Sequence, residues 1–332
     1  MRKNPPGKVA IFGCGYWGKN LVRNFHQLGA LGMVCDPSED ALRAACAIAP
    51  GVATATEFEA ALRSDEVDAV AIATPAETHE GLAIRSMRAG KDVFVEKPMA
   101  LHLEEGLRMR SESEREGRIL MVGHLMEYHP AVRALRQLVS GGALGEVFYI
   151  YSNRLNFGKI RTEENALWSF APHDIAVILR LAGQLPVEVT CVGGSYITPE
   201  LADVTVSCLK LKNGMRAHIF VSWLNPFKEQ KLVVVGERKM AVFNDVVDSG
   251  KLVLFDQRVR VNEQGPVLQK GENDEIGFDA DEPLKVECRH FLDCVASRET
   301  PLTDASSGIE VLRVLEACQH SLQNDGNVTA VR

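Results

Sequence analysis

The sequence predicts an α/β Rossmann domain with a parallel, doubly wound sheet, followed by an α+β domain with a large, open-faced, mainly antiparallel sheet. Strands and helices alternate over the first third of the chain, as in a parallel sheet with right-handed crossovers. A strand-rich stretch follows at about 187–262, with Asn213-Gly214 as a hairpin signal. The length of 332 residues also exceeds what one hydrophobic core usually supports. We expect domains at 1–123 and 124–332, with C-terminal helices that can pack back on the first.

The first domain is expected to contain five strands joined by helices. Apolar residues recur at helical spacing from Leu21 to Leu28, and Gly29 marks the end of that helix. Thr56 and Glu59 form a capping box, which predicts the start of a further helix. The expected strands cover residues 8–12, 31–35, 69–73, 92–95 and 119–122.

In the second domain the strands follow one another through turns, which is typical of an antiparallel sheet. The polar, turn-rich segment 264–283 reads as a mobile loop or crossover. We expect a long strand at 146–156 and helices near Pro130, after Pro172, at 284–297 and at 306–323.

Composition narrows the class of protein. The formal net charge of −7 argues against non-specific nucleic-acid binding, which requires a basic surface. No secretory signal or membrane-spanning run is visible, so we expect a cytoplasmic protein. The eight cysteines include no C-x-x-C pair and predict neither disulfides nor a metal site.

A glycine turn between the first strand and the first helix predicts a dinucleotide site. Residues 13–18 read G-C-G-Y-W-G, the G-x-G-x-x-G pattern. Gly13 makes the tight turn, Gly15 lets the backbone approach a pyrophosphate, and Gly18 lets the helix pack on the sheet. A glycine turn without a ligand is the alternative. Tyr16 and Trp17 lie within this expected cofactor site.

Asp36 follows the second strand, 18 residues past Gly18. A carboxylate there can bind both ribose hydroxyls and would repel a 2′-phosphate, so we expect NAD rather than NADP. A role as helix cap is also open and is compatible with ribose binding.

Further candidate residues follow other expected strands, where ligands of a parallel sheet bind. They are Thr74-Pro75 with His79, the tripeptide Glu96-Lys97-Pro98, and Gly123-His124. With the glycine turn, this set resembles the glucose–fructose oxidoreductase/inositol dehydrogenase family over essentially the whole chain. The resemblance implies that Thr74, Pro75, His79 and Glu96 belong to the cofactor site.

The resemblance also implies that Lys97 lies beside the nicotinamide and binds the hydroxyl that is oxidised. The residues agree, because Lys97 ends an apolar strand, where its ammonium would be partly desolvated. Glu96 points to the opposite face of that strand and is expected to contact cofactor or support structure. An ordinary solvated lysine at a strand end is the alternative for Lys97.

His173 lies in the run NALWSFAPHDIAV. Many family members carry an aspartate four residues before the histidine, whereas this chain has Ser169. Lys97 and His173 therefore remain as the expected proton-handling residues. Pro172 suits the first helical position, so His173 is expected in a first turn, where the helix dipole disfavours its charged form. A structural histidine is the alternative.

The amino-acid sequence of residues 153–174 resembles that of the family branch that acts on nucleotide sugars. The basic residues Arg154, Lys159 and Arg161 suit the diphosphate of a UDP-sugar, although they could equally be a solvated loop. Tyr128 either lines the sugar pocket or belongs to a helix start. Trp168 is either core or a wall of the nicotinamide pocket.

The resulting hypothesis is NAD-dependent oxidation of the 3-hydroxyl of UDP-N-acetylglucosamine to the 3-keto sugar nucleotide. By resemblance, a pyridoxal-phosphate aminotransferase would then make a diamino sugar, for example for lipid A, and the open sheet implies a homodimer or homotetramer. The alternatives are the matching uronate as substrate, an inositol or polyol dehydrogenase, a 3-ketosugar reductase, and a non-enzymatic NAD-binding sensor.

Overall fold

The computed structural model describes residues 7–332, which divide into two compact units. The first comprises residues 7–128 with Asp281–Leu312, and the second comprises His129–Ala280 with Arg313–Arg332. One holds a six-stranded parallel sheet and the other a nine-stranded, mainly antiparallel sheet. The predicted fold class is therefore confirmed.

The first unit is built on a parallel sheet in the order β3-β2-β1-β4-β5-β6. Every residue of β1, β4, β5 and β6 is buried. These strands read as continuous apolar runs because helices cover both faces of the sheet. The strands are β1 (Val9–Phe12), β2 (Leu31–Cys35), β3 (Ala53–Ala55), β4 (Ala69–Ile72), β5 (Asp92–Glu96) and β6 (Leu120–Gly123).

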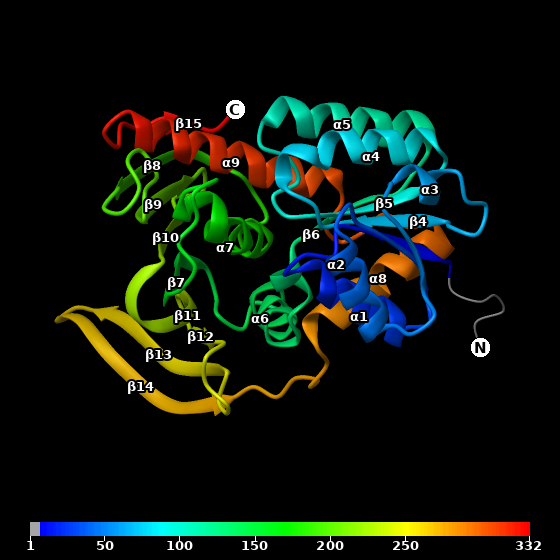
Figure 1. Cartoon of the computed structure of the whole chain (residues 1–332). Helices are drawn as coiled ribbons and strands as arrows, with labels where there is room; N and C mark the ends of the chain where they lie inside the picture. Colours follow the sequence, from blue (N-terminus) through cyan, green and yellow to red (C-terminus); the bar gives the residue numbers. More distant parts are fainter. Residues whose placement is uncertain (1–6) are drawn as a thin grey trace. The chain divides into compact units, whose positions relative to one another are not determined.

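Helices α1 (Gly18–Gln27) and α8 (Pro283–Ser297) lie together on one face of this sheet, and α4 (His79–Arg88) and α5 (Leu103–Glu116) on the other (Figure 1). The capping box predicted at Thr56 is wrong. The short helix α3 begins three residues later, with no side-chain cap, because the expected first turn is not helical. The unit also contains α2 (Glu39–Ile48), α3 (Glu59–Leu62), η1 (Ala76–Thr78) and η2 (Leu125–Tyr128).

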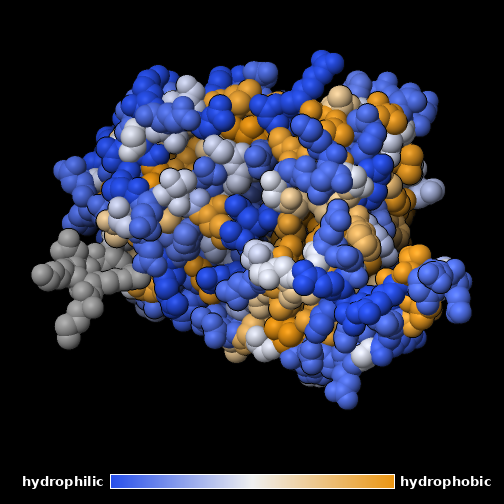
Figure 2. Space-filling view, turned by 180° about the vertical axis from the view of Figure 1, so that it is seen from behind, coloured by the Kyte–Doolittle hydropathy of each residue, from blue (hydrophilic) through white to orange (hydrophobic). Residues whose placement is uncertain are grey.

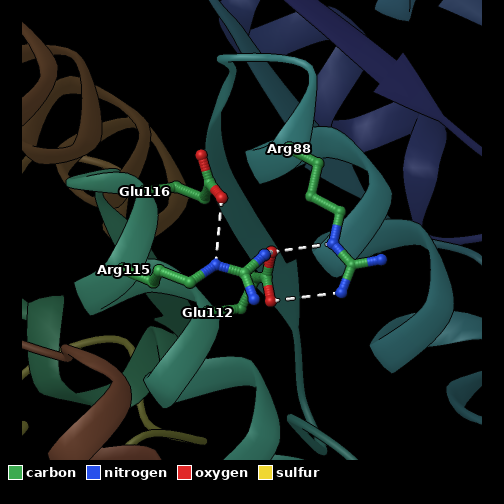
Figure 3. Close-up of polar contacts among 4 residues, drawn as sticks. All are labelled: Arg88, Glu112, Arg115 and Glu116. Carbon is green, nitrogen blue, oxygen red and sulfur yellow. Dashed lines mark hydrogen bonds and ion pairs between the residues drawn. The ribbon is translucent and has the colours of Figure 1, made fainter.

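An ionic cluster joins α4 to α5 (Figure 3). Arg88 donates from Nε to Glu112 Oε1 at 2.8 Å and from Nη2 to Oε2 at 3.4 Å. Arg115 pairs with the same carboxylate and also donates from Nε to Glu116 Oε1 at 3.1 Å. The hydrogen bond from Arg88 is the main cause that lowers the pKa of Glu112. The cluster therefore holds two neighbouring helices through one shared carboxylate.

The second unit is built on a sheet in the order β14-β13-β12-β11-β7-β10-β9-β8-β15. Its one parallel pair is β7 with β10, within the described residues. The predicted hairpin at Asn213-Gly214 is confirmed, because β9 and β10 pair antiparallel and Gly214 has a φ of +93°. The strands are β7 (Val147–Phe157), β8 (Pro186–Gly194), β9 (Val204–Leu211), β10 (Arg216–Ser222), β11 (Leu224–Gly236), β12 (Met240–Asn244), β13 (Leu252–Asn262), β14 (Gly265–Glu275) and β15 (Thr329–Ala330).

One face of the second sheet carries helices. Helix α7 (Ala166–Ala182) packs against β7, β9 and β10, and α6 (Pro130–Ser140) packs against α7 and β12. On the opposite face, Tyr149 stacks on Tyr151, which stacks on His218. These rings are partly exposed on the open face of the sheet. Helix α9 (Ala305–Gln323) contributes residues to both units.

The polar segment at 264–283 was predicted to be a loop, which is wrong for its first half. Residues Gly265–Glu275 form β14, which pairs antiparallel with β13 in a long curved hairpin (Figure 1). The strand has few apolar residues because it lies at the edge of the sheet, largely exposed to solvent. Apolar side chains are nevertheless exposed on this hairpin, among them Val261 and Leu268. Figure 2 shows hydrophobic surface beside the hydrophilic tip of the hairpin.

Candidate functional site

The glycine turn has the backbone geometry that a dinucleotide phosphate requires. Gly13 has a φ of +87°, and a Cβ there would lie 2.9 Å from the carbonyl oxygen of Ala73. A Cβ on Gly18 would lie 2.0 Å from the Gly13 oxygen, so only glycine allows α1 to start here. Around Gly15, by contrast, no protein atom lies within 4 Å of an added Cβ. The open backbone and the N-terminus of α1 therefore fit a pyrophosphate.

Asp36 fits the ribose end of the cofactor. Its Oδ2 accepts a hydrogen bond from the backbone N–H of Cys14 at 2.6 Å, and its Oδ1 accepts one from that of Ser38 at 2.8 Å. The side-chain cap of α2 is Ser38, which accepts from Ala41. Each Asp36 oxygen keeps a second lone pair for a ribose hydroxyl. Asp36 is thus anchored to the glycine turn itself.

His79 joins the ends of two neighbouring strands. Its Nδ1 lies 2.9 Å from the carbonyl oxygen of Pro98, after β5, and its Nε2 lies 2.9 Å from that of Thr74, after β4. The ring is 1% exposed, and burial lowers the pKa of His79, whereas the two carbonyl contacts act in the opposite direction. Both ring nitrogens are engaged within the protein. His79 therefore orders the turns of Thr74-Pro75 and Lys97-Pro98 rather than offering an atom to a ligand.

Glu96 connects the glycine turn to Lys97. The indole Nε1 of Trp17 donates to Glu96 Oε1 at 2.5 Å, and the backbone N–H of Lys97 donates to Oε2 at 3.3 Å. Burial raises the pKa of Glu96, while the Trp17 hydrogen bond and the Lys97 charge counteract that rise. A Cβ on Gly123, at the end of β6, would lie 3.0 Å from Glu96 Oε2. Lys97 itself is half-buried and directly follows β5.

In the second unit, Ser169 and His173 lie one turn apart on α7, hence on the same face. Ser169 is buried and His173 half-buried. The prediction that His173 occupies a first helical turn is wrong. Helix α7 begins after Asn165, whose side chain accepts from the N–H of Trp168 at 3.1 Å, so Pro172 lies in the helix interior. The argument from the helix dipole therefore does not apply to His173.

Arg154 is held by Asp174, a carboxylate that no sequence motif indicated. Its Nε donates to Asp174 Oδ2 at 2.8 Å and its Nη2 to Oδ1 at 3.1 Å. The hydroxyl of Ser152, also on β7, donates to the same Oδ1 at 2.6 Å. The Arg154 and Asp174 side chains are only 12% and 5% exposed. This pair fixes α7 to β7 at the residue next to His173, and the only sequence signal was that adjacency.

The remaining predicted residues have different surroundings. Lys159 is exposed in the segment between β7 and α7, and Arg161 pairs with Glu163 and Glu164. The indole of Trp168 donates to Gln319 Oε1 at 3.1 Å.

Tyr128 belongs to the core of the first unit. It is 2% exposed, and its hydroxyl lies 2.8 Å from that of Thr303. His129 caps α6, accepting from the N–H of Ala131. The His129 cap corresponds to a residue at a helix start, whereas Tyr128 contacts Thr303 within the core.

Two features of residues 7–332 limit the kinds of site that they can form. They contain no grouping of three or more histidine, cysteine or acidic side chains suited to a metal ion. None of their helices is both long and apolar enough to cross a bilayer.

Fold and site together define a dinucleotide-binding oxidoreductase of the Rossmann class. The family model described as "Oxidoreductase family, NAD-binding Rossmann fold" matches residues 7–124, and the GFO/IDH/MocA C-terminal domain matches 132–242. The chain belongs to the GFO/IDH/MocA oxidoreductase family, and its cofactor is NAD.

Curated relatives in this family differ in their reactions. A UDP-N-acetylglucosamine 3-dehydrogenase from Acidithiobacillus ferrooxidans is 27% identical over 92% of this chain and 94% of its own. A 2,7-anhydro-N-acetylneuraminate hydratase from Mediterraneibacter gnavus is 32% identical over 75% and 70%. An inositol 2-dehydrogenase from Paenarthrobacter aurescens is 25% identical over 98% and 99%.

Two solved structures share the fold along almost the whole chain. The Acidithiobacillus UDP-N-acetylglucosamine 3-dehydrogenase has a TM-score of 0.84 at 23% identity, covering 96% of this chain and 97% of that one. The WlbA dehydrogenase from Bordetella pertussis, in complex with NADH and UDP-GlcNAcA, has a TM-score of 0.80 at 21% identity, with coverage of 98% and 99%.

Proposed function

We propose that this NAD-dependent oxidoreductase oxidises the 3-hydroxyl of UDP-N-acetylglucosamine to the 3-keto sugar nucleotide. The observation that carries the proposal is the end-to-end similarity to a UDP-N-acetylglucosamine 3-dehydrogenase, over 92% of this chain and 94% of the relative. Lys97 and His173, the two proton-handling residues expected for such chemistry, are both present.

NAD held by the glycine turn and Asp36 would supply the acceptor for the hydride that leaves C3. The protein must hold the hydroxyl and remove its proton, so that the C–O bond becomes a carbonyl. Lys97 suits this task because its backbone is anchored through Glu96 and its turn through His79. We assign the second proton-handling role to His173, whose helix is fixed to β7 by the Arg154–Asp174 pair.

The sugar diphosphate needs cationic partners. The exposed ammonium of Lys159 is the first candidate. Arg161 is the second, since a phosphate can compete with its exposed partner Glu163. Arg154 is the weakest of the three predicted contacts, because Asp174 already occupies two of its nitrogens. Ser169 and Trp168 stay as proposed sugar contacts near His173.

Inositol oxidation is the second candidate, because an inositol 2-dehydrogenase aligns over 98% of this chain. The experiment that separates the candidates incubates purified protein with NAD and, separately, UDP-N-acetylglucosamine, its uronate, UDP-glucose and inositol, following NADH absorbance. An aminotransferase with an amine donor is added to trap an unfavourable ketone equilibrium. We expect turnover of UDP-N-acetylglucosamine. Turnover of inositol alone would refute the proposal, and NAD binding without turnover of any substrate would favour a sensor.

A further inference from the structure

Glu287, on α8 of the first unit, is a buried carboxyl group with no role in the fold described so far. The residue is 0% exposed, and within residues 7–332 neither carboxyl oxygen has a hydrogen-bond partner. Removing an ionised carboxylate from water without a partner is very costly. A glutamate in this place is therefore stable only as the neutral acid.

The charged group that acts on Glu287 is another carboxyl group, that of Glu96. Burial is the main cause that raises the pKa of Glu287 well above its usual range, and the charge of Glu96 raises it further. The side chains of Tyr128 on η2 and Cys288 on α8 also lie within reach, and burial raises the pKa of both. Neither supplies a positive charge that would favour an ionised Glu287.

Glu96, by contrast, is arranged to be the anion of the two. It accepts hydrogen bonds from the Trp17 indole and the Lys97 backbone, and the Lys97 charge lies close by. Two neighbouring buried carboxyl groups do not ionise together, so one proton stays on the pair. The negative charge is more stable on the carboxyl group that accepts hydrogen bonds. That proton belongs on Glu287.

We propose that Glu287 is a positioning residue that keeps one proton on the Glu96–Glu287 pair, so that Glu96 alone carries the charge that holds the Trp17 indole and the Lys97 backbone. The Glu96 anion then joins the glycine turn to the turn at Lys97-Pro98, here called the lysine turn. Glu287 acts on both turns only through that anion. The effect on turnover rests on the proposed function of Lys97, whereas the protonation of Glu287 does not.

The first test measures unfolding by denaturant between pH 5 and pH 8. A carboxyl group whose pKa is raised in the folded state stabilises the fold below its unfolded pKa of about 4.3. It loses that contribution as the pH rises above this value. Glu287→Gln cannot ionise and escapes this loss. Its folding equilibrium constant should rise relative to the unmodified protein, by up to about tenfold per pH unit for one proton. Glu287→Met should behave alike.

Glu282→Gln is the matched control. Glu282 precedes α8, and its hydrogen bond with Arg23 lowers the pKa of this carboxyl group, the opposite direction. The ionised Glu282 carboxylate already makes its full contribution to folding stability above pH 5. Glu282→Gln should therefore be less stable than the unmodified protein by an amount that does not depend on pH between 5 and 8. If the stability difference between Glu287→Gln and the unmodified protein is equally independent of pH, the proposal is overturned.

The second test follows kcat/KM against pH with the substrate found active. A glutamine amide is neutral like the protonated Glu287, so Glu287→Gln should leave the acid limb in place. Glu287→Met removes the neutral polar group near the Glu96 anion, so its acid limb should move to higher pH, with no shift in Glu282→Gln. An unmoved acid limb in Glu287→Met, beside a pH-dependent gain in stability, would show a purely structural Glu287 and sink the positioning role. If no substrate reacts, the same pH series is run on the NAD dissociation constant, where an unmoved profile in Glu287→Met counts equally against the proposal.

Discussion

At the scale of single residues, the site depends on side chains whose partners lie far away in the sequence. The carboxylate of Asp36 binds the glycine turn, and His79 joins the ends of two strands. The contacts of Glu96 reach from the first helix to the lysine turn. The candidate ligand-binding residues thus rest on a shell of buried polar contacts, which fixes their positions within the protein.

Lys97→Ala and His173→Ala provide the direct test of the proton-handling roles. Both residues are half-buried, so their truncation should leave the fold intact. We expect kcat to fall by about 10²-fold or more in each, the usual contribution of a positioned acid or base. NAD binding, measured by fluorescence titration, should persist. Full activity in both variants would remove these residues from the mechanism, and Lys159→Ala should instead raise KM.

The Arg154–Asp174 pair should show the energetics of a buried ion pair. Asp174→Asn leaves the Arg154 guanidinium without its counter-charge, which should cost about 3 kcal/mol or more of unfolding free energy in urea titrations. The double variant Arg154→Met/Asp174→Leu leaves no stranded charge and should be more stable than Asp174→Asn. If the loss of unfolding free energy in the double variant equals the sum of the losses for the two single changes, the two side chains act independently.

At the scale of elements, the sequence predicted those with strong periodicity and missed those whose signal is polar. The Rossmann strands and the Asn213-Gly214 hairpin were found because buried runs and turn residues are local signals. Strand β14 escaped because an exposed edge strand has little apolar pattern. Pro172 suggested a helix start, although the cap is Asn165. Glu287 could not be found at all, since only folding buries it and brings it near Glu96, far away in the chain.

The ionic cluster between α4 and α5 predicts a pH-dependent stability. Arg88 lowers the pKa of Glu112, so the carboxylate stabilises the fold above its unfolded pKa and loses this effect as pH falls through the folded value. In thermal unfolding, Glu112→Gln should have a lower Tm than the unmodified protein at pH 7, and the difference should vanish toward pH 3. Glu114 is exposed and pairs with Arg110, so Glu114→Gln should show almost no difference in Tm at either pH.

At the scale of the whole molecule, we propose that the open face of the second sheet binds another copy of the chain. Tyr149, Tyr151 and His218 form an aromatic row on the face opposite α7. Tyr149→Lys should therefore shift the mass measured by light scattering toward the monomer. Val328→Lys, at a more exposed apolar position elsewhere in the unit, is the control. A monomer at all concentrations before mutation would contradict the proposal.

The division of the chain also bears on its synthesis. The Rossmann unit takes α8 from residues 281–312, and the ring of Phe291 on that helix packs edge-on against Phe25 and Phe94. While the ribosome makes the second sheet, the nascent first unit still exposes the apolar surface that Phe291 will cover. Chains fold as segments leave the ribosome. The first unit is synthesised first, but it can complete its fold only after α8 has been made. A fragment ending at residue 128 would lack this helix and should be prone to aggregation and proteolysis.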